Sequence, residues 1–120
     1  MTVLVVEDDE ALADAMAATL EEEGLDVMVA LNGRAALDAL RARPRPGLIL
    51  LDIAMPVMNG WEFRREQLRD KSLAGIPVVI CTADGRAAEA ARQLGAAGVL
   101  TKPLSAPELI HAVLTHCQAS

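Results

Sequence analysis

Aromatic residues are almost absent from this sequence of 120 residues: they make up 2% of it, as one tryptophan, one phenylalanine and no tyrosine. Hydrophobic residues nevertheless make up 52%, so the core has to be built from leucine, valine, isoleucine, alanine and methionine. This is enough apolar material for one domain, and the chain is too short for two ordinary ones. We therefore expect a single domain over residues 1–120.

Cysteines and long apolar runs are also scarce. Cys81 and Cys117 form no C-x-x-C pair, and Cys81 lies inside an apolar run, so both are interpreted as isolated thiols in a reducing compartment. No apolar stretch approaches the length of a membrane span. The N-terminus has no basic region before its first apolar run, which argues against a signal peptide. These absences favour a soluble cytoplasmic domain without membrane contact.

Positive charge is in short supply as well. The chain has 11 lysines and arginines against 17 aspartates and glutamates, a formal net charge of −6. Nucleic-acid phosphates select basic surfaces, so this balance argues against direct nucleic-acid binding.

What the sequence does contain is a regular series of short apolar runs. Three of them, around Val5, Ile49 and Val79, are continuous rather than alternating, which is typical of strands buried on both faces of a parallel sheet. The segments between the runs have the spacing of amphipathic helices. The predicted strands are Thr2–Val6, Asp26–Ala30, Leu48–Leu51, Ile76–Cys81 and Gly98–Thr101.

Each predicted helix is bounded by residues that start or stop helices. Asn59 and Ser105 are typical N-caps, and Gly24 is typical of a helix C-terminus. Because strands and helices alternate five times, right-handed crossovers place helices on both faces of the sheet, in a three-layer, doubly wound α/β fold. The predicted helices are Glu10–Glu23, Arg34–Arg43 stopped by Pro44 and Pro46, one from the Asn59 cap to Arg69 with Trp61 or Phe63 partly inward, Arg86–Leu94 stopped by Gly95, and one from the Ser105 cap to His116.

Polar residues stand where the predicted strands end. In an open parallel sheet, ligands gather beyond those carboxyl ends. Asn32 and Gly33, after the second run, look like ordinary turn residues. The candidate site residues are Glu7, Asp8 and Asp9 after the first run, Asp52 after the third, Thr82 at the end of the fourth and Lys102 after the fifth.

This combination of side chains suits phosphoryl chemistry. Crowded carboxylates repel one another unless a cation lies between them, and Mg²⁺ is typically held by one or two carboxylates together with phosphate oxygens. Lys102 can pair with a phosphoryl oxygen. A carboxylate such as Asp52 can attack phosphorus and form an aspartyl phosphate.

Each residue also has an ordinary structural explanation when it is taken alone. An aspartate at a strand end is usually a helix cap or turn residue, and Lys102 can be a solvated surface charge. The acids from Glu7 to Asp9 can form the first turn of a helix. The functional interpretation is favoured because the right residue type stands at four strand ends together, whereas the structural one needs a separate reason for each.

With these motifs the sequence resembles the receiver domains of bacterial two-component response regulators over essentially its whole length. The resemblance implies a flavodoxin-like fold with a five-stranded parallel sheet in the order 2-1-3-4-5. It also implies a signalling phosphoacceptor rather than an enzyme. The motifs are Val5-Val6-Glu7-Asp8-Asp9, Leu50-Leu51-Asp52-Ile53-Ala54-Met55-Pro56 followed by Asn59-Gly60, Cys81-Thr82-Ala83 and Leu100-Thr101-Lys102-Pro103.

The resemblance further implies a role for each site residue. Asp52 would be the phosphoacceptor and a magnesium ligand, and Thr82 and Lys102 would bind phosphoryl oxygens. The other magnesium ligands would be Asp8 directly, Glu7 mainly through water, and the backbone carbonyl of Ala54.

The resemblance has a departure that bears on signalling. Three residues before Lys102 the family usually has an aromatic switch residue, and this chain has Val99; Leu104 stands where many relatives have phenylalanine. A valine is smaller and has few χ1 states, so coupling to the surface is expected to be weaker or to run through backbone shifts. Asp9 would start a helix, and the Lys102–Pro103 bond is a candidate cis peptide.

Three functions stay open. The leading one is a receiver that takes a phosphoryl group from a histidine kinase or histidine phosphotransfer protein and signals to an unknown output protein. Because Met1 directly precedes the first strand, a stand-alone receiver is favoured over a domain of a longer chain. A phosphorylation-independent pseudo-receiver is disfavoured because the acids, Thr82 and Lys102 are all present. A phosphohydrolase of the haloacid-dehalogenase type is disfavoured because Ala54 stands where it needs a second acid.

Overall fold

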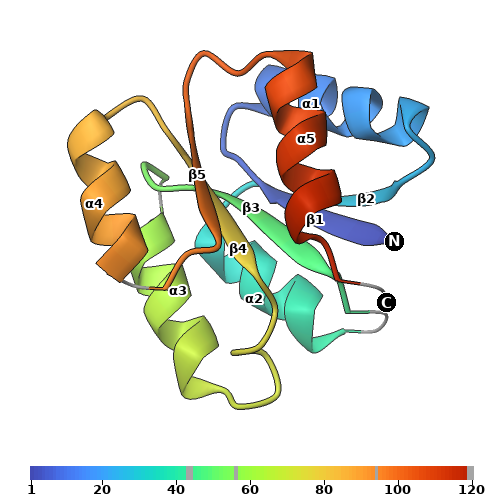
Figure 1. The fold of residues 1–120 in the computed structure, drawn as a ribbon. Coiled ribbons are helices and arrows are strands. Elements are labelled where there is room, and N and C mark those ends of the chain that lie inside the picture. Colours follow the sequence, from blue (N-terminus) through green and yellow to red (C-terminus); the bar gives the residue numbers. More distant parts are fainter. Residues whose placement is uncertain (43–44, 56, 94, 119–120) are drawn as a thin grey trace.

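Strands and helices alternate along the chain in the computed structural model, which describes residues 1–42, 45–55, 57–93 and 95–118. The five strands form one parallel sheet in the order β2-β1-β3-β4-β5, with helices on both faces (Figure 1). The predicted fold class and strand order are therefore confirmed. The elements are β1 (Thr2–Val6), α1 (Glu10–Glu22), β2 (Asp26–Ala30), α2 (Gly33–Arg41), β3 (Leu48–Asp52), α3 (Gly60–Arg69), β4 (Val78–Thr82), α4 (Gly85–Gln93), β5 (Gly98–Thr101) and α5 (Ala106–His116).

Two strands reach one residue further toward the predicted site than the apolar runs indicated. β3 extends through Asp52 and still pairs with β4 there, and β4 extends through Thr82 and pairs with β5 there. β4 begins at Val78, later than predicted: the N–H of Ile76 donates to the carbonyl of Leu73 in the preceding turn, and Ile76 packs into the core ahead of the strand. Backbone pairing rather than a loop thus fixes the positions of Asp52 and Thr82.

The helix ends follow the predicted caps, with one correction. The side chains of Asn59 and Ser105 accept backbone N–H groups in the first turns of α3 and α5, and Gly24 has a φ of +83° behind α1. Asn32, expected to be an ordinary turn residue, is the N-cap of α2, which begins at Gly33: its side chain accepts a backbone N–H of the first turn at 2.8 Å. The predicted helix ends at Glu10, Arg69 and His116 match the observed ones, and the remaining ends differ by one or two residues. Four residues of the predicted boundaries and motifs lie outside the described residues: Arg43, Pro44, Pro56 and Leu94.

The sheet separates two hydrophobic clusters. Helices α2, α3 and α4 cover one face, where Phe63 is fully buried and Trp61 packs at the edge of the cluster; α1 and α5 cover the other face. Burial on both faces explains the continuous apolar runs. Cys81 is buried, Cys117 is partly buried, and both are free thiols. Among the described residues, no helix combines the length and the apolar character needed to cross a membrane.

The turn after β3 is held against the sheet by the start of α3. Asn59 and Glu62 form a capping box, in which each side chain accepts the backbone N–H of the other residue, at 3.0 and 3.2 Å. The N–H of Gly60 donates to the carbonyl of Ile53 at 2.9 Å, and a Cβ at Gly60 would lie 2.6 Å from the carbonyl oxygen of Asp52. Helix α3 can therefore begin directly against Asp52 only because Gly60 has no side chain.

We expect Gly60→Ala to lower the free energy of unfolding by about 2 kcal/mol, because the new methyl group has to displace backbone atoms rather than a flexible side chain. Gly75→Ala is the matched control, since nothing lies within 4 Å of a Cβ there; its effect should stay below about 0.5 kcal/mol. Urea denaturation followed by circular dichroism measures both. Equal stability of the two variants would contradict the close approach at Gly60.

Candidate functional site

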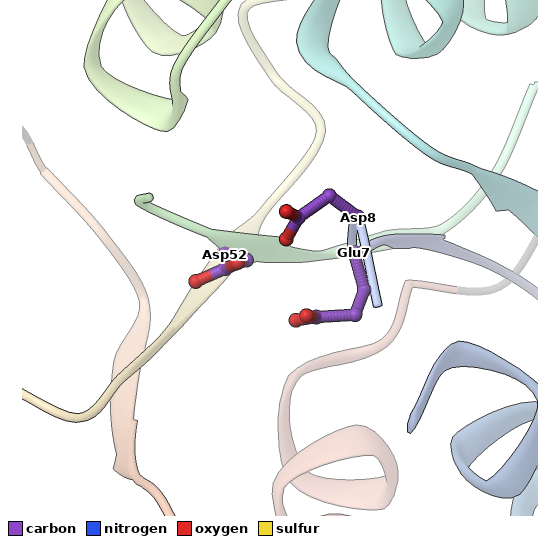
Figure 2. A group of neighbouring side chains, drawn as sticks. All are labelled: Glu7, Asp8 and Asp52. Atoms are coloured by element: carbon purple, nitrogen blue, oxygen red, sulfur yellow. The ribbon is translucent and has the colours of Figure 1, made fainter. Parts of the chain in front are cut away.

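Three carboxylates from two neighbouring strands gather at the carboxyl edge of the sheet. Glu7 and Asp8 directly follow β1, and Asp52 is the last residue of β3. One carboxylate oxygen from each lies within 4.8 Å of the other two (Figure 2). Glu7 and Asp52 are only 2% and 6% exposed, whereas Asp8 is exposed. The structure therefore brings together the acids that the sequence places at these two strand ends.

Asp9 follows the cluster in sequence but serves the start of α1. Its side chain accepts the N–H of Leu12 at 3.2 Å, which makes it the N-cap of the helix. Its own N–H donates to Oε1 of Glu7 at 3.3 Å. The predicted helix-start role of Asp9 is confirmed, and the N–H helps to hold the Glu7 carboxylate in place.

Lys102 reaches the cluster from the end of β5. Its Nζ lies 3.0 Å from Oε2 of Glu7 and 3.5 Å from Oδ1 of Asp52. Its backbone N–H donates to the carbonyl of Thr82 at 2.8 Å, and the Lys102–Pro103 peptide is cis, as predicted. The ammonium group thus lies beside two buried carboxylates and offsets part of their mutual repulsion.

The ionisation of these groups reflects that crowding. Burial and then the neighbouring Glu7 carboxylate raise the pKa of Asp52 from 3.8 to about 6, although Lys102 and a backbone hydrogen bond from Ala54 act in the opposite direction. Burial by itself would lower the pKa of Lys102, but the hydrogen bond to Glu7 and the charge of Asp52 outweigh burial and raise it. The lysine therefore stays charged, while Asp52 ionises only at some cost.

A hard divalent cation would relieve this repulsion. The donor set consists of carboxylate oxygens, which are the ligands that Mg²⁺ prefers. Glu7, Asp8 and Asp52 therefore fit a magnesium ion. Ala54 lines the same pocket, and the role of its backbone carbonyl as a further ligand stays a prediction.

Thr82 stands at the end of β4 and is 5% exposed. Its hydroxyl accepts the N–H of Asp84 at 3.0 Å and lies 3.5 Å from the carbonyl oxygen of the same residue. The predicted phosphoryl-binding hydroxyl is thus inside the pocket but is bound to the turn that leads into α4.

All of these side chains open into one pocket of about 450 Å³. It is also lined by Trp61, which the sequence predicts only as a partly inward residue of α3. Its position in the first turn of the helix that begins against Asp52 is the sequence feature from which this could have been predicted. The polar lining residues are Glu7, Asp8, Asp52, Thr82, Asp84 and Lys102, and the apolar ones are Ile53, Ala54, Trp61, Ala83 and Ala87.

Known proteins share this sequence pattern and fold. The family model of the response regulator receiver domain matches residues 3–114. Sensory transduction protein RegX3 of Mycobacterium tuberculosis is 40% identical over 111 residues, which cover 91% of this chain and 47% of that protein. A 14.6 kDa protein of Leptolyngbya boryana is 39% identical over 124 residues, which cover 99% of this chain and 92% of that protein.

The solved structures give the same result. The receiver domain of NtrX from Brucella abortus has a TM-score of 0.88 and 29% identity, and the match covers 98% of this chain and 99% of that one. The chain spans about half the length of RegX3 and of several other curated relatives.

We expect Asp52→Asn to stabilise the metal-free protein. A pKa raised from 3.8 to about 6 means that the folded state holds this proton more firmly than the unfolded state. This proton stabilises the fold fully below the pKa of 3.8 that Asp52 has in the unfolded chain. The stabilisation is lost as the pH rises through the folded-state pKa of about 6. At pH 7.5 the variant should therefore gain on the order of 2–3 kcal/mol, since one pKa unit corresponds to about 1.4 kcal/mol. Urea titrations from pH 7.5 to 5 should show the gain shrinking; a gain independent of pH would contradict the raised pKa.

Proposed function

Because the chain belongs to the response regulator receiver domain family, we propose that its Asp52 accepts a phosphoryl group and that residues 1–120 form one receiver domain. The observation that carries this proposal is the position of Asp52 at the end of β3, buried beside two acids and in reach of Lys102. The chain acts in two-component signalling, in which such a phosphorylation is the input.

The arrangement supports an in-line transfer. One Oδ atom of Asp52 forms the bond to phosphorus while the bond from phosphorus to the leaving group breaks, and the leaving group keeps the electron pair. Lys102 already lies 3.5 Å from Asp52 and is placed to bind a phosphoryl oxygen. Magnesium held by Asp8 and Asp52, with the Ala54 carbonyl and with Glu7 through water, would neutralise charge on the other oxygens.

The proposed donors are a histidine kinase or a histidine phosphotransfer protein, and the receiver would act in the cytoplasm on an output protein. Two relatives, RpaA of Synechocystis and MtrA of Mycolicibacterium paratuberculosis, are named as DNA-binding proteins, and they are about twice as long as this chain. The net charge of −6 supports a chain that signals through protein contacts rather than by binding DNA itself.

The two other functions have less support. A phosphohydrolase with an aspartate nucleophile would need a second acid where Ala54 stands. A phosphorylation-independent pseudo-receiver would not need the buried acid pair or the lysine that spans it, and Lys102 contacts both Glu7 and Asp52.

The attachment of α4 indicates how the signal could leave the site. Ala91 is the one buried residue of this helix, whereas each of the other four helices buries three or four. The C-terminal end of α4 is held by Arg64, whose guanidinium donates to the carbonyl of Gly95 at 3.3 Å. The N-terminal end is joined to the site through the hydrogen bond between Thr82 and Asp84.

We propose that a phosphoryl group on Asp52 draws the hydroxyl of Thr82 away from Asp84. The start of α4 would then be released, while its other end stays held near Ala91. This route needs no aromatic side chain at Val99, which packs against the same hydrophobic cluster as Ala91.

Phosphorylation can be tested with acetyl phosphate and Mg²⁺, followed by intact mass. The wild-type protein should gain one phosphoryl group, and none when the metal is chelated. Asp52→Asn should gain none, because an amide is a poor nucleophile. Asp8→Asn should react at least about tenfold more slowly because it loses a metal ligand. Asp14→Asn, the same charge change at an exposed position of α1, should react like the wild type. A label that persists in Asp52→Asn would overturn the assignment.

The release of α4 can be tested by hydrogen exchange. Phosphorylation should speed amide exchange in the first turn of α4 by about fivefold, the effect of losing one hydrogen bond of about 1 kcal/mol. Thr82→Ala should show this faster exchange without phosphorylation and no further change with it, while Thr82→Ser should behave like the wild type. Slow exchange in unphosphorylated Thr82→Ala would show that the hydroxyl does not hold the helix.

A further inference from the structure

The pocket around Asp52 presents one aromatic ring. Of the two aromatic residues in the chain, Phe63 is fully buried, so Trp61 is the aromatic side chain available at the surface. It is partly buried against the hydrophobic cluster beneath α3 and lines the pocket with the remaining part. The exposed part of this ring gives the pocket a surface that can contact a planar or apolar group.

The volume of the pocket leaves room for such a contact. Three phosphoryl oxygens and six magnesium ligands amount to about nine water-sized positions, roughly 270 Å³ at about 30 Å³ each, and several of those ligands belong to the protein itself. The pocket measures about 450 Å³. Space therefore remains for the leaving group, the part of the donor to which the phosphoryl group is bonded.

The in-line geometry indicates where that group lies. The leaving group departs from phosphorus on the side opposite Asp52, away from the carboxylates and Lys102. Trp61 and Ala87 supply apolar lining to the same pocket, so they are available to contact the leaving group.

Trp61 is also held in a fixed position relative to Asp52. It follows Gly60, whose N–H is bonded to the turn after β3 and whose Cα approaches the Asp52 backbone too closely for a side chain. The capping box of Asn59 and Glu62 encloses it in the first turn of α3. A ring carried on a fixed backbone and partly packed against the hydrophobic cluster can favour one leaving group over another, because less of its conformational freedom is lost when the donor binds.

We propose that Trp61 is a specificity-determining residue that favours phosphodonors whose leaving group is an imidazole ring. This inference rests on the proposed transfer to Asp52. In the step concerned, the bond between Oδ of Asp52 and phosphorus forms as the bond from phosphorus to the imidazole nitrogen breaks. The electron pair of the broken bond stays on that nitrogen, and the other ring nitrogen keeps the proton that it already carries. Trp61 contacts the ring of the leaving imidazole.

The test compares two small donors that both carry a phosphorus–nitrogen bond. Phosphoimidazole releases imidazole, whereas phosphoramidate releases ammonia, so their ratio of labelling rates isolates the ring. At donor concentrations below saturation and with Mg²⁺ present, Trp61→Leu should lower this ratio about 3- to 10-fold, through the phosphoimidazole rate alone. Trp61→Phe should keep the ratio within about twofold of the wild type. Intact mass measures each rate, and urea denaturation checks that the variants are folded.

The control is Val57→Ala, which changes an apolar residue in the turn before α3 that is 81% exposed and does not line the pocket. It should leave both rates unchanged. A wild-type chain labelled by neither donor would refute the proposed phosphorylation itself. If the wild type is labelled by both donors and Trp61→Leu keeps the wild-type ratio, or lowers both rates equally, the role of Trp61 is overturned while the phosphorylation stands.

Discussion

The repulsion among carboxylates at the ends of β1 and β3 is the constraint on which the functional edge of this protein depends. Glu7 and Asp52 are held almost entirely out of water, where like charges interact most strongly. Lys102 offsets part of that repulsion from the end of β5. Together with burial, what is left of it raises the proton affinity of Asp52 and makes a divalent cation a favourable addition.

Such a site can exist only on a rigid support. The strands that carry the acids are buried on both faces, so the backbone positions of the acids cannot move apart without disrupting two hydrophobic clusters. On the far side of β3, Gly60 and the Asn59 cap bring α3 directly against Asp52. The free energy that the core supplies is thus partly offset by the repulsion among the buried acids of the site, as is common for functional sites.

The two helices beside the pocket differ in how firmly they are attached. α3 buries four residues and supplies the wall that contains Trp61, whereas α4 buries one and is joined to the site through Thr82. A firmly held wall suits the selection of a donor, and a weakly held helix suits a change of conformation. In this chain Val99 stands in place of an aromatic switch residue. The weak attachment of α4 gives the proposed phosphorylation signal a route that does not need one.

The family motifs implied the strand order through the resemblance. The sequence by itself determined the alternation of strands and helices, through continuous apolar runs and helix caps, and it determined which residue types stand at the strand ends. Those features are local: a period, a cap or a motif can be read without knowing what lies across the sheet. The predicted cap at Asn59 was correct for this reason, while the similar role of Asn32 was overlooked because a turn residue and a cap share one composition. The tertiary structure alone decided that Lys102 contacts Glu7 more closely than Asp52, that the hydroxyl of Thr82 is bound to the turn before α4, and that Trp61 faces the pocket. Each of these is a contact between residues distant in sequence or a choice among rotamers, and such choices are set by the packing of neighbouring elements rather than by the residues themselves.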